Sequence, residues 1–165
     1  MAQKGKNGGA GKPLDRIDCE IINLLQRDGR ISNTDIGKKI GISEGTVRTR
    51  LNRLIDNEII QIVAVSNPIK LGFKIVGHLR IQVETGKIEA VMTALKEIKA
   101  LWFIVKTTGG NTGIDAEFVC RSLEELNELI FEHVNPIDGV VKTETTLTLD
   151  FVKRRYDWGV AEGEE

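Results

Sequence analysis

The sequence predicts an α+β protein of two domains, in which a small helical domain precedes a ferredoxin-like βαββαβ domain. Between residues 14 and 56, apolar residues recur at helical spacing in three short segments, each bounded by a capping residue or a glycine. From residue 75 onward, segments of alternating hydrophobicity and helical segments follow one another in the order strand, helix, strand, strand, helix, strand.

The helical domain is predicted from its caps and turns. Asp15 fits the start of a first helix, Ser32 that of a second and Ser43 that of a third. Gly41 lies in the short turn between the second and third helices, which is the arrangement of a (winged) helix-turn-helix. The β-branched run 59–66 that follows predicts a strand.

The second domain is predicted from period-two and helical patterns. Its helices can cover only one face of the sheet, so the other face must meet water or another subunit. Strands are expected at 75–84, 101–108, 114–121 and 140–152, and helices at 87–99 and from Ser122 onward.

The domain boundaries follow from composition. The Gly-, Lys- and Asn-rich start predicts a flexible tail, and Asn67-Pro68 marks a connector. We expect a tail at 1–13, a helix-turn-helix domain at 14–60, a strand and linker at 61–73, a ferredoxin-like domain at 74–152 and a C-terminal tail at 153–165.

Composition excludes several classes of protein. No apolar run is long enough to span a bilayer, and the N-terminus lacks the apolar core of a signal peptide, so a cytoplasmic protein without a membrane partner is expected. Two distant cysteines and two histidines favour reduced thiols and no metal site. The net charge is −1, but residues 1–57 carry 11 Lys/Arg against 7 Asp/Glu, which suggests different partners for the two halves.

The third helix has a polar outward face. At 100° per residue, Val47, Leu51 and Leu54 cluster on one side. Gly45, Thr49, Asn52 and Arg53 are expected opposite them, with Thr46 and Arg48 flanking and Arg50 at the edge near the core. Hydroxyl, amide and guanidinium groups are the ones that contact phosphates and base edges of DNA.

Residues 14–60 resemble the opening domain of the Lrp/AsnC (leucine-responsive, or feast/famine) transcription regulators. The resemblance rests on LDRIDCEII, the DGRIS link, the IGKKIGIS turn and the following RTRLNRL. The downstream βαββαβ order resembles that family's effector-binding and assembly domain, so the likeness extends to about residue 152.

The resemblance implies a sequence-specific regulator that binds double-stranded DNA through the third helix. Arg48, Thr49, Asn52 and Arg53 are the main expected contacts, with Ser43, Thr46 and Arg50 secondary. It further implies dimers formed through the sheets, which assemble into tetramers or octamers.

The turn 107–115 is the expected effector site. Glycine-rich turns are most often simple hairpin loops. In the related regulators, however, a glycine followed by an aspartate lines an amino-acid pocket at the contact between dimers. This turn is longer from Gly109 to Asp115 than the family's, and Gly113-Ile114-Asp115 is the alternative equivalent. The candidates are Gly109, Gly110, Asn111, Thr112, Gly113 and Asp115, with Thr143 and Thr145 as weaker ones.

Two alternatives remain at this point. Sirohaem decarboxylases resemble the same architecture, although His78 and His133 are the chain's only histidines. An assembly protein that joins related regulators without its own effector is the other. No catalytic residue and no cofactor beyond a possible amino acid effector are expected.

Overall fold

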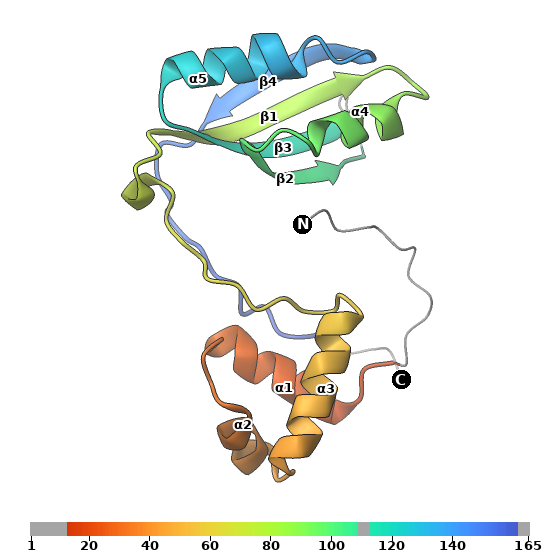
Figure 1. Cartoon of the computed structure of the whole chain (residues 1–165), viewed down its shortest axis with the longest axis vertical. Helices are drawn as coiled ribbons and strands as arrows, with labels where there is room; N and C mark the ends of the chain where they lie inside the picture. The colour runs from red at the N-terminus through yellow and green to blue at the C-terminus, as the bar shows by residue number, and fades with distance from the viewer. Residues whose placement is uncertain (1–12, 109–112, 162–165) are drawn as a thin grey trace. The chain divides into compact units, whose positions relative to one another are not determined.

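The computed structural model describes residues 13–108 and 113–161 and divides the chain into two compact units (Figure 1). The first unit takes the chain up to Ala64 together with the C-terminal residues from Lys153. The second unit is Val65–Val152. The C-terminal residues therefore share a unit with the N-terminal helices, to which they are not adjacent in sequence.

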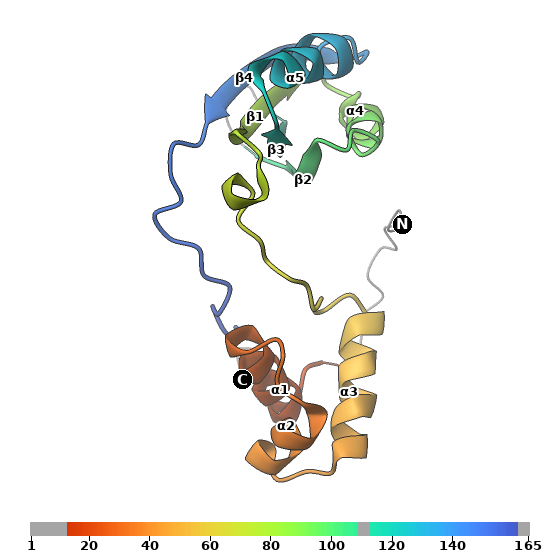
Figure 2. The same ribbon diagram turned by 60° about the vertical axis from the view of Figure 1, so that its left-hand side comes forward.

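The first unit contains the three expected helices, α1 (Arg16–Arg27), α2 (Asn33–Ile40) and α3 (Glu44–Asp56), seen from a second side in Figure 2. Each begins at a side chain that accepts a main-chain N–H from the first turn: Asp15, Ser32 and Ser43. These caps satisfy amide groups that the helix itself leaves without partners. They explain why the helices start where the sequence predicts.

The three helices close around a small apolar core of isoleucine, valine and leucine: Ile21, Ile22, Ile36, Val47 and Leu54. Gly37 allows α2 to approach the turn before α3, because a Cβ there would lie 2.6 Å from the Ile42 carbonyl oxygen. Gly41 ends α2 with a φ of 82°, a left-handed conformation that favours glycine. The helix-turn-helix geometry thus depends on both glycines.

The strand expected at 59–66 is absent, and that prediction was wrong. Residues 60–66 have no regular secondary structure, and Ile62, Val63 and Val65 are exposed. A strand needs a neighbour that pairs with its main chain along its length, and this run forms no strand pairing within the described residues. β-Branched composition alone therefore does not produce a wing here.

The second unit has the expected βαββαβ order, and its sheet is antiparallel in the order β2-β3-β1-β4. A short 3₁₀ helix (Ile69–Leu71) precedes it. The elements are β1 (Ile75–Val83), α4 (Ile88–Leu95), β2 (Leu101–Lys106), β3 (Ile114–Cys120), α5 (Leu123–Glu128), the π-helix η2 (Leu129–Val134) and β4 (Val140–Leu147). Helix α4 and strand β4 are shorter than the sequence predicts.

The helices α4 and α5 lie on one face of the sheet (Figure 1). Leu79, Ile81 and Phe118 from the strands and Val91 and Leu95 from α4 are buried in the core between them. Alternation of inward and outward side chains along β1 and β3 produces this core. The opposite face is open within the unit.

The open face of the sheet carries paired charges. His78 and Arg80 point to it from β1, 3.9 Å from Glu117 and Asp115 of β3 respectively. Lys142 and, less strongly, Arg80 lower the pKa of the Glu144 carboxyl on β4. The part of this face formed by β1, β3 and β4 therefore carries charges of both signs.

Candidate nucleic-acid interface

The N-terminal half of α3 presents a row of polar side chains to solvent. Ser43 Oγ accepts the Thr46 N–H at 3.1 Å, and the two hydroxyl oxygens are 2.8 Å apart. Thr49 donates its hydroxyl to the Gly45 carbonyl at 3.0 Å. The exposed members of the row are Ser43, Thr46, Arg48, Thr49 and Asn52, all among the residues expected to contact DNA.

The side chains of this row differ in whether they already have a partner within the protein. The Arg48 guanidinium pairs with Glu44 one turn earlier, on the surface. The Asn52 carboxamide has no hydrogen-bond partner among the described residues. An exposed ion pair contributes little to stability, so Arg48 can exchange Glu44 for a phosphate at small cost.

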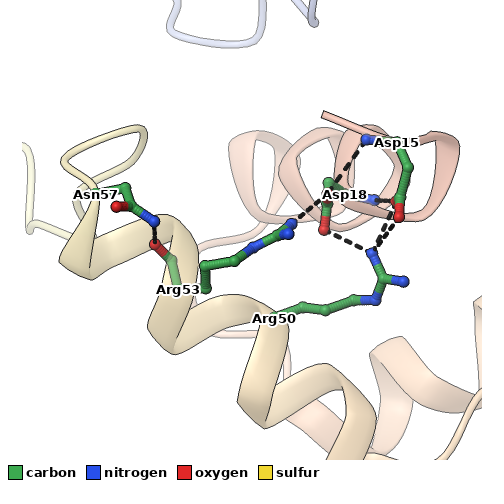
Figure 3. A network of polar contacts seen from close by, with 5 residues as sticks. All are labelled: Asp15, Asp18, Arg50, Arg53 and Asn57. Carbon is green, nitrogen blue, oxygen red and sulfur yellow. Dashed lines mark hydrogen bonds and ion pairs between the residues drawn. The ribbon is translucent and has the colours of Figure 1, made fainter. Parts of the chain in front are cut away.

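Arg50 and Arg53 are held by two aspartates of α1 (Figure 3). Arg50 Nη1 donates to both Asp15 carboxylate oxygens, at 2.8 and 2.7 Å, and to Asp18 Oδ1 at 2.9 Å. Arg53 donates to Asp18 Oδ2, and its carbonyl accepts the Asn57 side chain at 2.8 Å. We call these four charged residues the Asp–Arg clamp.

The expectation that Arg53 points away from the helix core was wrong. Its guanidinium lies against Asp18, which has no exposed surface, and the Arg53 side chain is only 30% exposed. A helical projection gives the direction of Cβ, whereas a long arginine side chain can turn toward a buried carboxylate. Arg50, expected at the edge near the core, does brace α3 against α1.

The electrostatics of the Asp15–Arg50 pair favour its ionised form. The Arg50 guanidinium, and after it the Asp18 main-chain N–H, lower the pKa of the Asp15 carboxyl to about 2. Hydrogen bonds from Arg50 to Asp15 and then Asp18 raise the pKa of the guanidinium further above its ordinary value. The Asp15–Arg50 ion pair therefore persists at neutral pH and helps to hold α3 against α1.

The sequence interpretation recognised Asp15 only as a helix cap and overlooked Asp18. Both belong to LDRIDCEII, where two aspartates stand three residues apart in the first turn of α1. A buried carboxylate requires a cationic partner. The arginine-rich third helix could have indicated that Asp15 and Asp18 pair with its arginines. The pairing itself spans 32 to 35 residues, which local patterns do not reveal.

The expected effector residues lie only partly in the described chain. Gly109, Gly110, Asn111 and Thr112 fall outside the described residues. The Gly113 N–H donates to the Ile81 carbonyl at 3.2 Å, so it already has a partner in the sheet. Asp115 lies on the open face beside Arg80.

The two threonines of β4 line a different feature, a hollow of about 490 Å³ between η2 and β4. Thr143 donates its hydroxyl to the Asn135 side chain at 2.9 Å. Ile130, Phe131 and Val141 supply apolar walls. The structure therefore separates Thr143 and Thr145, which face the helices, from Asp115, which faces the other side of the sheet.

Residues 13–108 and 113–161 contain neither a membrane-spanning helix nor a cluster of metal-binding side chains. In these ranges no helix has the length and apolar character needed to cross a membrane. The same residues hold no group of three or more His, Cys, Asp or Glu side chains that could bind a metal ion.

Two family descriptions match the chain. The AsnC-type helix-turn-helix domain matches residues 14–55, and the Lrp/AsnC ligand binding domain matches residues 78–158. An uncharacterised HTH-type transcriptional regulator of Pyrococcus abyssi is 38% identical over 149 residues, which cover 90% of this chain and 91% of the relative. The regulator Ptr1 of Methanocaldococcus jannaschii is 35% identical over 137 residues, covering 82% and 92%.

Solved structures show the same fold. E. coli AsnC superposes with a TM-score of 0.74 at 22% identity, covering 87% of this chain and 97% of AsnC. A Neisseria meningitidis regulator, solved with L-methionine, gives 0.75 at 18% identity, covering 88% and 96%. The relatives are named as transcriptional regulators rather than enzymes, which disfavours the decarboxylase alternative. The chain belongs to the Lrp/AsnC family of transcriptional regulators and carries that family's ligand-binding domain.

Proposed function

We propose that this regulator binds double-stranded DNA through the exposed row of α3. The observation that carries the proposal is that Ser43, Thr46, Arg48, Thr49 and Asn52 form one exposed polar surface on the second helix of a helix-turn-helix. Such a helix places its N-terminal residues against base edges in the major groove. Hydroxyls and Arg48 suit phosphate contacts, and the exposed Asn52 carboxamide suits adenine.

The clamp assigns different roles to the three arginines of α3. Arg48 is the expected phosphate contact, because among the described residues it pairs only with a surface glutamate, Glu44. Arg50 and Arg53 orient the helix through Asp15 and Asp18, and they contact DNA only where a guanidinium edge remains exposed. Base recognition then falls mainly to Thr49 and Asn52.

Arg48→Ala tests the DNA interface. We expect weaker binding to operator DNA and a shallower dependence of affinity on salt, by about one unit of slope, because one phosphate contact is lost. Operator DNA would first be selected from genomic fragments. Binding would then be measured by fluorescence anisotropy over a salt series.

The matched control is Arg121→Ala, which removes another exposed arginine paired with a glutamate four residues away. It should leave both affinity and slope unchanged. Equal salt slopes for wild type and Arg48→Ala, with the fold intact, would contradict the proposed interface.

We further propose that the second unit binds an amino acid that changes DNA affinity. Support comes from the match to the family's ligand binding domain and from the neisserial relative solved with L-methionine. Asp115 can face the ligand's ammonium group if it exchanges Arg80, 3.9 Å away. Binding of the amino acid would favour one oligomeric state, or one arrangement of the helix-turn-helix domains, over another.

Calorimetry with a panel of amino acids tests this second proposal. Asp115→Ala should abolish binding of whichever amino acid the wild type takes, whereas Asp150→Ala, the removal of an exposed carboxylate outside the sheet, should not. If no amino acid binds the wild type, the effector proposal fails, and a role as an assembly partner of related regulators is favoured.

We also propose that two chains pair through the open sheet face and act in the cytoplasm, beside the DNA. The face carries both signs of charge, on Arg80 and on Asp115 and Glu117, so it can complement a second copy across a two-fold axis. Arg80→Glu should shift the mass measured by light scattering from dimer toward monomer. An unchanged mass would contradict this interface.

A further inference from the structure

The C-terminal segment 157–160 lies on α1, although it follows the second unit in sequence. Gln26 Nε2 donates to the Gly159 carbonyl at 3.2 Å, and the Gly159 N–H donates to Gln26 Oε1 at 2.8 Å. One carboxamide thus satisfies both main-chain groups of one residue, as a neighbouring strand would. The two residues are 133 positions apart.

Packing accompanies these hydrogen bonds. Val160 packs against the apolar core of the three helices. Gly159 has a φ of 80°, and a Cβ there would lie 3.6 Å from the Asn23 side-chain oxygen. At Gly159 the segment makes two hydrogen bonds to Gln26, and at the next residue, Val160, it makes apolar contact with the core. The preceding Trp158, by contrast, is largely exposed.

We propose that residues 157–160 are a docking segment whose partner surface is the C-terminal half of α1, at Asn23 and Gln26. The docked segment belongs to the same chain. The DNA-binding unit is then held by two chain connections, one after α3 and one after β4 (Figure 2). The contact residues Gly159 and Val160 lie beyond residue 158, where the match to the family's ligand binding domain ends.

Helix α1 is engaged at both of its ends. Its N-cap Asp15 and Asp18 in its first turn hold Arg50 of α3, and Gln26 in its last turn holds Gly159. The second connection therefore ends on the helix that orients α3.

Hydrogen exchange of the full-length protein tests the docking. Gln26→Ala removes both hydrogen bonds, and Val160→Ala removes apolar contact with the core. Each should make the amides in the last turn of α1 exchange faster, by roughly tenfold for Gln26→Ala, since two hydrogen bonds of ordinary net strength are lost.

Matched controls are present in the chain. Gln61→Ala alters an exposed glutamine, and Val152→Ala alters a valine that is 93% exposed. Both should leave exchange in α1 unchanged. If Gln26→Ala and Val160→Ala behave like these controls, the segment is solvated and the proposal is wrong.

A separate measurement tests whether residues 157–160 dock on their own chain or on a second copy. Protection of α1 should persist on dilution through the range in which light scattering shows dimers dissociating. Protection that is lost together with the dimer would assign the segment to a second copy and overturn the second connection within one chain. Neither measurement uses DNA, so failure here is distinct from failure of the proposed DNA interface.

Discussion

Asp18 is fully buried, and its two carboxylate oxygens face Arg50 and Arg53 separately. A buried carboxylate is stable only because cationic donors replace the water that it loses. The same pairing restrains α3 from rotating about its own axis on α1. One residue of α1 therefore helps determine which face of α3 is exposed.

Asp18→Asn should destabilise the first unit by about 2–3 kcal/mol. Removing one partner of a fully buried ion pair costs ~3–5 kcal/mol. We expect a smaller loss here because the Arg50 and Arg53 side chains remain partly exposed to water. Chemical denaturation would measure the loss. Asp35→Asn is the control, since Asp35 is an exposed carboxylate on α2 with a 3.9 Å ion pair to Lys38. Equal stabilities for the two variants would mean that the clamp contributes nothing.

Asp15 should make the first unit sensitive to acid. Its folded pKa of about 2 lies below the ordinary value of 3.8, so its ionised form stabilises the folded state. That contribution is complete above the ordinary pKa and is lost as the pH falls from there toward 2. In Asp15→Asn, the decline of stability across this pH window should be shallower than in wild type. Acid titration followed by circular dichroism measures it, and parallel curves would refute the assignment.

Two helical glycines of the helix-turn-helix should respond oppositely to alanine. At Gly37 a Cβ would meet the Ile42 carbonyl oxygen at 2.6 Å, so Gly37→Ala should destabilise the unit by ~1–3 kcal/mol through overpacking. At Gly45 the nearest atom is 3.9 Å away, so Gly45→Ala should stabilise α3 by up to ~1 kcal/mol.

Gly45→Ala also separates DNA contact from folding. If the start of α3 approaches DNA closely, the added methyl group weakens operator binding while thermal stability rises. Melting temperature and binding affinity are therefore measured on the same preparation. Unchanged affinity in this stabilised variant would place the start of α3 away from the DNA surface.

The part of the chain that the structure describes has two separate apolar cores, one in each unit. Leu54→Ala should lower the stability of the first unit by ~2–5 kcal/mol, as for other buried leucines. Exchange in β1–β4 should stay unchanged, whereas amides of α1 and of residues 159–160 should exchange faster. Phe118→Ala should produce the reverse pattern. Loss of protection in both units from either variant would show that they unfold as one.

The prediction of the elements succeeded where the signal is local. Asp15, Ser32 and Ser43 cap helices within three residues, and alternation along β1 and β3 specifies their buried faces. The run 59–66 failed because a strand depends on a distant neighbour that composition does not supply. The exposure of Thr49 and Asn52 was also predictable, since each lies opposite the apolar stripe of α3.

By itself the sequence determined the order of the helices and of the four sheet strands, the helix-turn-helix with its exposed polar row, and the family, although it wrongly predicted a strand at 59–66. All of these follow from spacings of a few residues or from a recognisable motif. Only the tertiary structure decided that Arg53 turns to Asp18 and that Gly159 docks on Gln26, across 35 and 133 residues. Long side chains and chain ends reach many partners, and burial of charge and of main-chain groups in the folded chain selects among them.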